Sequence, residues 1–157
     1  MSYTIKFKDG SEKSFDSLAG EDLRGADLRM FWLFYENLSE AILSGANLRG
    51  AFMHGAYLTN ADLTNADLHG VDLVDTDLSC SDLTGADLTD ADLRDADLTG
   101  ADLICANMRG ANLQGAKLSD ANLCGADLQG AIMRGVDLSS ANLCGAKLEG
   151  AITDKEA

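Results

Sequence analysis

The chain repeats itself every five residues, and this period limits the folds open to it more than any other feature. From Leu18 to Leu148 every fifth residue is Leu or Met, with Leu at 24 of the 27 positions. Two residues before these positions stands a small residue, which is Ala at 20 of the 26 places from Ala26 to Ala151. Asp or Asn usually lies between them and Gly often fills the fifth place, so the consensus is Ala-(Asp/Asn)-Leu-x-Gly.

A period of five fits neither a helix nor a flat strand. Five residues turn an α-helix by about 500°, so successive leucines would move around its axis by about 140°. On a flat strand the odd step would place alternate leucines on opposite faces. All the leucines share one interior only if the chain turns a corner in every repeat, with Ala and Leu inward and the other places outward. Gly in the fifth place, or Asn60, Asn65 and Asp75, suits a corner that needs positive φ.

The outward residues indicate how many corners make one coil. At a step of 20 residues the place after the leucine holds an unbroken hydroxyl series: Ser39, Thr59, Ser79, Thr99, Ser119 and Ser139. The parallel series is richer in cations: Arg29, Arg49, His69, Thr89, Arg109 and Gln129. Because the two series separate at this step, the sequence predicts four repeats, and therefore four faces, in each coil.

The run Ala-Asp-Leu-Thr-Asn-Ala-Asp-Leu from Ala61 to Leu68, with its continuation to Leu148, resembles the pentapeptide-repeat family. The resemblance implies an all-β fold, a right-handed quadrilateral β-helix (β-solenoid) in which the leucine is the central inward residue. It also implies about seven four-sided coils stacked roughly 4.8 Å apart.

The two ends of the chain lie outside the repeat. Tyr3, Ile5 and Phe7 alternate with polar residues before a turn signal at Asp9-Gly10, so residues 1–15 are expected to form a strand or hairpin cap. The solenoid itself is expected over residues 16–151. Residues 152–157 are expected to form a polar C-terminal tail.

The repeat is irregular between residues 31 and 40. Phe31 and Glu36 occupy inward places that otherwise hold a small residue, and an unpaired carboxylate in the interior would be costly. We therefore expect this coil either to bulge outward or to be distorted enough to turn Glu36 to solvent.

Aromatic residues are concentrated near the same place and form a candidate interaction patch. Its members are Phe31, Trp32, Phe34, Tyr35, Phe52, His54 and Tyr57. At a step of 20, Trp32 and Phe52 stack on one face. Two alternatives follow: the N-terminal hairpin covers the patch and completes a cap, or the patch binds a partner or a second copy of the chain. Ile132 and Ile152 fall on the Trp32 face and add a weak apolar patch for dimerisation.

Charge gives the second functional clue. The net charge of −14 argues against nucleic acid and anionic membranes as partners and permits a protein with a basic surface. Nine consecutive repeats form a candidate acidic binding surface: Asp62, Asp67, Asp72, Asp77, Asp82, Asp87, Asp92, Asp97 and Asp102. Asp is also favoured at corners through local hydrogen bonds, which is the structural alternative.

The family resemblance implies a specific alternative function for these carboxylates. Some family members bind DNA gyrase by mimicking DNA, so the chain could be an acidic DNA mimic that binds or inhibits such a topoisomerase. Those members are dimers built through a C-terminal module, and no such module follows the repeats in this sequence.

Catalytic chemistry is not expected. The four cysteines (Cys80, Cys105, Cys124 and Cys144) match no zinc spacing, and without a secretory signal they predict reduced thiols in the cytoplasm. His54 and His69 fall on different faces, and no apolar run of about 18 residues could span a membrane. A leucine-filled axis leaves no pocket in which polar groups converge. The sequence predicts a non-enzymatic protein-interaction scaffold without catalytic residue, metal or cofactor, its partner unidentified, which is a monomer or weak homodimer.

Overall fold

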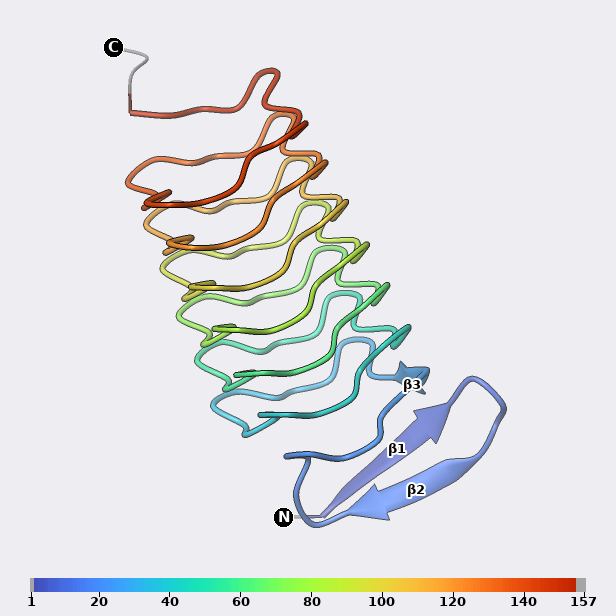
Figure 1. The fold of residues 1–157 in the computed structure, drawn as a ribbon. Coiled ribbons are helices and arrows are strands. Elements are labelled where there is room, and N and C mark those ends of the chain that lie inside the picture. The colour runs from blue at the N-terminus through green and yellow to red at the C-terminus, as the bar shows by residue number, and fades with distance from the viewer. Residues whose placement is uncertain (1, 155–157) are drawn as a thin grey trace.

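Each coil is joined to the next by backbone hydrogen bonds between residues 20 positions apart. In the computed structural model, which describes residues 2–154, one-residue parallel β-bridges join Asp22 to Ile42 and continue at every repeat until Ile132 joins Ile152. Four repeats separate the two residues of each bridge, as the outward series predicted. The coils stack into an elongated rod with the N-terminal hairpin at one end (Figure 1).

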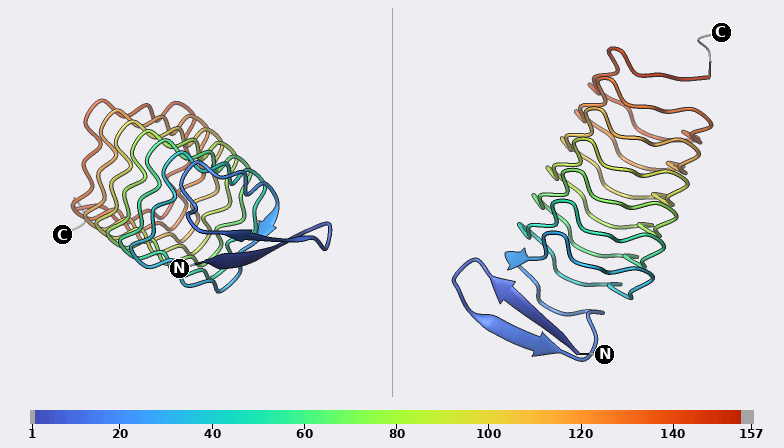
Figure 2. Two further views of the ribbon diagram at one scale, coloured as in Figure 1. Left: turned by 90° about the horizontal axis from the view of Figure 1, so that it is seen from below. Right: turned by 180° about the vertical axis from the view of Figure 1, so that it is seen from behind.

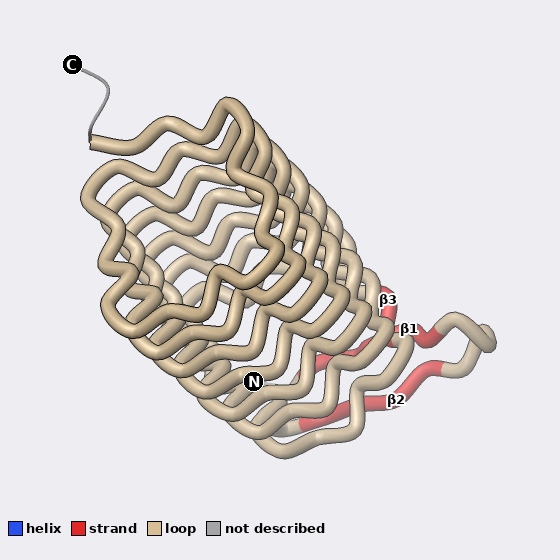
Figure 3. The backbone as a smooth tube through the Cα atoms, turned by 45° about the horizontal axis from the view of Figure 1, so that its top comes forward, coloured by secondary structure: helices blue, strands red, loops and turns tan. Residues whose placement is uncertain are grey.

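The same few hydrogen bonds recur in every repeat. The Leu88 N–H donates to the carbonyl of Asn107 at 2.7 Å, and the Asn107 N–H donates back to the carbonyl of Ala86 at 2.9 Å. Within one coil, the Ala91 N–H donates to the Leu88 carbonyl at 3.1 Å, which closes the turn at the corner. Two residues of each repeat form its corner, so the bridges between coils stay short. The coils are therefore drawn as loops (Figure 3).

The fifth place of each repeat is the corner, and its backbone is left-handed as expected. Non-glycine corner residues have φ between 54° at Asn65 and 60° at Glu40. L-residues avoid this region because Cβ approaches the following carbonyl, and glycine and asparagine tolerate it best. The preference for Gly in the consensus therefore has a backbone cause.

The interior of the rod is a continuous column of leucine, methionine and alanine. The leucines from Leu18 to Leu128 have essentially no exposed surface, including Leu88 and Leu98. Where Thr76 takes the place of alanine, it is still buried, and its hydroxyl donates to the Met53 carbonyl at 3.0 Å. Burial declines in the last coil, where Leu148 is 42% exposed.

The only strands longer than one residue within residues 2–154 lie at the N-terminal end. β1 (Tyr3–Phe7) pairs with β2 (Glu12–Phe15) and with β3 (Ala26–Asp27), both antiparallel, in the sheet order β2-β1-β3. The hairpin of β1 and β2 lies across the first coil (Figure 2). Ile5 is completely buried there, so the hairpin closes the apolar interior.

The coil at residues 31–40 keeps the regular pattern, so the expected bulge or distortion is wrong. Trp32 bridges to Phe52 as every other repeat does. Phe31 lines a hollow together with Thr4 and Lys6 of the hairpin, and its ring packs partly buried against the core. Glu36 is half-buried beside Tyr3, and hydrogen bonding to the Glu36 carboxylate raises the pKa of Tyr3 to about 12.

Candidate functional site

Four columns of bridged residues run along the rod, and each presents a different set of outward side chains. We name each column after its first bridged residue: the Asp22, Asp27, Trp32 and Asn37 columns. Within a column each residue bridges to the one 20 positions later, so neighbours along the rod follow directly from the numbering.

Three aromatic side chains of the Trp32 column lie together on the outside of the rod, and we call Trp32, Phe34 and Phe52 the aromatic cluster. The ring centroids of Trp32 and Phe52 are 6.4 Å apart with the rings edge to face. The Phe34 ring lies 6.4 Å from Trp32 and 6.0 Å from Phe52. Trp32 is 74% exposed and Phe34 is 43% exposed, so the cluster forms an apolar surface that faces solvent.

The N-terminal hairpin caps the first coil, as the first alternative expected, but it leaves the aromatic cluster uncovered. The structure also divides the seven predicted residues. Phe31 packs toward the core, whereas Tyr35 stands on a corner with its ring 5.6 Å from that of His54. Tyr57 is exposed but belongs to the Asn37 column.

The acidic residues of the repeat accept hydrogen bonds from backbone N–H groups at their own corners. Asp62 Oδ1 accepts a hydrogen bond from the Thr64 N–H at 3.0 Å, and Asp82 Oδ1 accepts one from the Thr84 N–H at 2.9 Å. Asn122 accepts the equivalent bond from Cys124 at 3.3 Å. An Asp and an Asn oxygen satisfy the corner equally well, and each carboxylate keeps a second oxygen for water or an ion pair.

Most carboxylates of the Asp27 column are paired with cations. These ion pairs are Asp27–Arg29 at 2.6 Å, Asp67–Arg49 at 3.4 Å, Asp127–Arg109 at 3.5 Å and Asp127–Lys147 at 3.3 Å. Burial opposes ionisation of Asp127, but the Gln129 N–H and Lys147 outweigh it and lower the pKa of that carboxyl. The column therefore carries little free negative charge.

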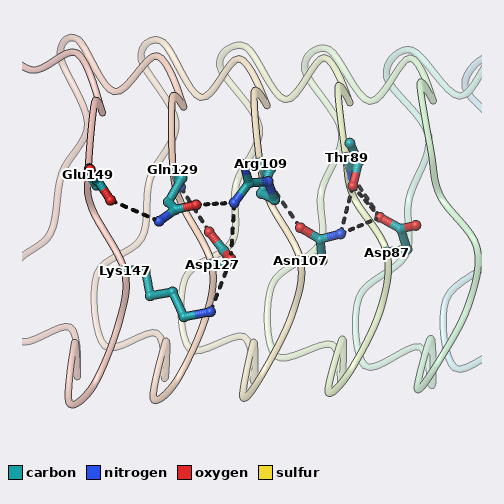
Figure 4. Close-up of polar contacts among 8 residues, drawn as sticks. All are labelled: Asp87, Thr89, Asn107, Arg109, Asp127, Gln129, Lys147 and Glu149. Atoms are coloured by element: carbon teal, nitrogen blue, oxygen red, sulfur yellow. Dashed lines mark hydrogen bonds and ion pairs between the residues drawn. The ribbon is translucent and has the colours of Figure 1, made fainter.

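Polar contacts link successive coils along the same column (Figure 4). The Asn107 side-chain amide donates to Asp87 at 3.2 Å and to the Thr89 hydroxyl at 2.8 Å. One coil further, the Arg109 guanidinium donates to the side-chain oxygen of Gln129. This face satisfies its own charges and hydrogen bonds, which makes it a poor candidate for an electrostatic binding surface.

The Asp22 column has the opposite character. Asp62, Asp82 and Asp102 are bridged in series, and none of them takes part in an ion pair between described residues. We call these three the uncompensated row. Asp22, at the start of the column, is instead paired with Arg24 at 2.6 Å, and the hydrogen bonds from Arg24 lower the pKa of Asp22 to about 2.

The remaining predicted carboxylates lie on the other columns, so the nine do not form one surface. Asp72 and Asp92 lie in the Trp32 column, and Asp77 and Asp97 lie in the Asn37 column. Sequence could have revealed part of the pairing, because an Arg two residues after an Asp reaches back to it, as Arg94 does to Asp92 at 2.7 Å.

A hollow of about 450 Å³ between the hairpin and the first coils was not expected from the sequence. Its lining includes Phe7, Lys8, Lys13 and Arg24. All three cations already have partners: Lys8 donates to a backbone carbonyl at 2.7 Å, Lys13 lies 5.0 Å from the Phe7 ring centroid, and Arg24 pairs with Asp22. Asp9 and Asp22 also line the hollow, so its cations and carboxylates are mixed and it has no marked excess of positive charge for an anion.

Within residues 2–154 no three His, Cys, Asp or Glu side chains are grouped so that they could hold a metal ion. The four cysteines are free thiols. Cys124 and Cys144 lie one coil apart, and burial together with the neighbouring Cys144 thiol raises the pKa of Cys124. A search of the described chain finds no helix long and apolar enough to cross a membrane.

Comparison with known proteins agrees with the repeat pattern. The family model for pentapeptide repeats matches residues 41–79, 81–120 and 116–152 as eight copies. The chain belongs to the pentapeptide repeat family. Solved members of this family, such as the structure that is 42% identical to the chain with a TM-score of 0.58, form a right-handed β-helix, which accounts for the stacked coils. The matching model is not that of a catalytic family.

Several solved pentapeptide repeat proteins are similar to the chain. The protein Rfr23 from the cyanobacterium Cyanothece 51142 is 42% identical over 59% of the chain and 64% of Rfr23, with a TM-score of 0.58. The match thus spans less than two thirds of that protein. HetL from the cyanobacterium Nostoc sp. strain PCC 7120, described as involved in heterocyst differentiation regulation, is 37% identical over 90% of the chain and 78% of HetL, with a TM-score of 0.37.

A more distant likeness extends to QnrB1, a plasmid-mediated fluoroquinolone resistance protein. Its R167E trypsin-treated form is 22% identical over 85% of the chain and 77% of QnrB1, with a TM-score of 0.52. At this identity the likeness concerns the fold alone. A search of curated proteins finds no match to the chain.

Proposed function

We propose that this pentapeptide repeat protein is a non-enzymatic scaffold that binds another protein through the outward side chains of its solenoid. The observation that carries the proposal is the exposed aromatic cluster, whose three rings contact one another on a regular backbone. Exposed apolar patches of this kind mark interaction sites, and exposed aromatic side chains are the commonest anchors of protein interfaces.

The proposed scaffold is a quadrilateral rod of about seven coils at a spacing of roughly 4.8 Å. The four bridge columns support this geometry, with one column on each face. A rod of this kind presents side chains at regular intervals without a cleft, which suits an extended or flat partner surface rather than a small substrate.

The proposed partner is a protein with a basic surface, and the scaffold itself is a monomer or weak homodimer. The net charge of −14 supports this choice, because it repels nucleic acid and anionic membranes and attracts cations. We place the scaffold in the cytoplasm, where four free thiols would stay reduced.

Affinity capture from native lysate tests the proposal. A protein retained by the wild-type chain is expected to be lost with a Trp32→Ala, Phe34→Ala variant. The matched control replaces two outward aliphatic residues on the face of the Asp22 column, Ile42→Ala and Ile104→Ala, and should retain the partner. Equal retention by the wild-type chain and the Trp32, Phe34 variant would rule out the aromatic cluster as the anchor.

The uncompensated row supports a second candidate, an acidic DNA mimic that binds a topoisomerase such as DNA gyrase. Its carboxylates Asp62, Asp82 and Asp102 follow one another on adjacent coils and form no ion pair among the described residues. A gyrase supercoiling assay tests this candidate: inhibition by the wild-type chain should disappear when all three are changed to Asn. Supercoiling that is unaffected by the wild-type chain would eliminate the DNA-mimic function.

A further inference from the structure

We propose that the Trp32 column binds an extended basic segment of the partner, with one cationic side chain over the aromatic cluster and another on Asp72. This inference rests on the proposed scaffold function and specifies the chemistry of what the scaffold binds. It depends on three features of the column: the exposed rings, the carboxylates next to them, and the spacing between the two.

The aromatic cluster is already packed, so it offers a surface and not a cavity. With ring centroids 6.0–6.4 Å apart, the three rings contact one another and leave no gap for an inserted side chain. What remains open is the outer face of the cluster, above all that of the 74% exposed Trp32. The face of an indole ring attracts cations, and arginine in particular stacks on it.

The charges beside the cluster are negative and lack a strong cation partner. Asp72 bridges to Phe52 on the next coil, and Asp75 lies 3.8 Å from His54. Among the described residues, Asp72 and Asp75 form no ion pair with Lys or Arg; Arg94 also attracts Asp72, but its guanidinium is bonded to Asp92. A positively charged partner therefore complements this surface.

The spacing along the column fits an extended peptide. Adjacent coils lie roughly 4.8 Å apart, so Trp32 and Asp72 are about 10 Å apart along the rod. In an extended peptide, side chains on one side recur about every 7 Å. Two cations separated by one residue, with flexible side chains several ångströms long, can therefore reach the cluster and the carboxylate together.

Two other occupants fit less well. A second copy of the chain would bring its own net charge of −14 toward Asp72 and Asp75. The N-terminal hairpin is already engaged elsewhere, because β1 pairs with β3 and buries Ile5 in the core. The basic segment is thus favoured by charge, and self-association becomes an alternative outcome of the test.

The single tryptophan makes the test direct, because Trp32 is both the proposed contact and the only indole fluorophore in the chain. The probe is a blocked hexapeptide of alternating Ala and Arg, compared with the same peptide carrying Gln in place of Arg. We expect the Arg peptide to change Trp32 emission saturably and to bind more weakly as salt is added. The Gln peptide should leave the emission unchanged.

Two variants separate a specific site from general attraction to an acidic protein. Asp72→Asn should weaken Arg-peptide binding about two- to five-fold, the range of an exposed ion pair. Asp82→Asn removes the same charge from the same place of the repeat in the Asp22 column, and should leave binding unchanged. Trp32→Leu, followed by the anisotropy of a labelled Arg peptide, should weaken binding by a similar factor.

Each contrary result has a distinct meaning. Equal effects of Asp72→Asn and Asp82→Asn, or no emission change with the Arg peptide, would overturn the inference. Sedimentation that shows a dimer dissociated by Trp32→Leu would assign the surface to a second copy instead. If capture of a partner depends on Trp32 but not on salt, the scaffold function is supported and the basic segment is ruled out. Peptide binding without any captured partner would instead remove the scaffold function.

Discussion

At single positions, the repeat is explained by two backbone requirements. The residue before the leucine usually offers an oxygen to the N–H two positions later, which Asp and Asn do. The fifth residue must adopt positive φ, which Gly does without strain. The inward places require only the right size. Because each requirement concerns neighbouring atoms, it recurs in every repeat and appears in the sequence as the consensus.

The corner requirement can be tested at Gly70. It has φ of +63°, and an added Cβ would meet no atom within 4 Å, so a substitution there measures the backbone cost alone. We expect Gly70→Ala to reduce the free energy of unfolding by about 1–2 kcal/mol. Gly70→Asn should cost clearly less, because Asn60 and Asn65 already adopt φ of 58° and 54°. Urea unfolding measures both, and equal losses would contradict the backbone explanation.

The contact between Tyr3 and Glu36 predicts sensitivity to alkaline pH. The pKa of Tyr3 is raised from 10.0 to about 12, mainly through hydrogen bonding to Glu36. A raised pKa stabilises the fold fully below pH 10 and loses its contribution as the pH rises from 10 to about 12. Urea midpoints across this range should fall for the wild-type chain. Tyr3→Phe, which cannot ionise, should lack this component, and parallel curves for the two proteins would contradict the assignment.

Among the structural elements, the coils and the hairpin depend on each other. A coil buries its leucines only because another coil, or the hairpin, lies on each side of it. At the N-terminal end Ile5 of the hairpin is completely buried, and Phe31 packs partly buried against the same core. At the other end Leu148 is left 42% exposed. The stability of a repeat therefore depends on its place along the rod.

Leucine-to-aspartate substitutions at two places should show this dependence. Leu88 is completely buried, so Leu88→Asp places an unpaired carboxylate in the core, which costs several kcal/mol and should abolish folding. Leu148→Asp occupies the same place of the repeat at the exposed end and should lower the melting temperature by only a few degrees. Far-UV circular dichroism during heating distinguishes them. Similar behaviour of the two variants would mean that burial does not vary along the rod as described.

In the whole molecule, the excess of negative charge is distributed unequally around the rod. The Asp27 column neutralises itself through Arg29, Arg49, Arg109 and Lys147. The uncompensated row repels itself, because its carboxylates stand on adjacent coils. The Trp32 column combines exposed rings with Asp72. The same rod thus presents one nearly neutral face, one strongly acidic face, and one that is both apolar and acidic.

Two triple variants test whether negative charge is distributed unequally around the rod. Changing the uncompensated row (Asp62, Asp82 and Asp102) to Asn should preserve the fold and raise the melting temperature at low salt, because like-charge repulsion is relieved. The matched variant changes Asp27, Asp92 and Asp127, which pair with Arg or Lys, to Asn. It should lower the melting temperature at low salt. Both differences should shrink near 1 M salt, where the Debye length is about 3 Å. Shifts of the same sign would show that the ion pairs do not matter.

The family and the architecture were predictable from the sequence because each repeat makes the same contacts over a short, constant distance. The step of 20 residues was visible in the hydroxyl series from Ser39, and it is the step of the bridges. The buried leucines and the left-handed corners followed from the same pattern. These properties depend on local sequence and on the identical neighbour above and below.

The candidate site was only partly predictable, because it depends on contacts between parts of the chain that the repeat does not relate. The direction in which the hairpin docks decides that Phe31 is covered and Trp32 is not. Side-chain conformation decides that Lys117 reaches Asp97 one coil away, at 3.0 Å, while Asp82 forms no ion pair among the described residues. The sequence identifies the charged and aromatic residues. Packing at the cap and the side-chain conformations on the surface determine which of them are exposed.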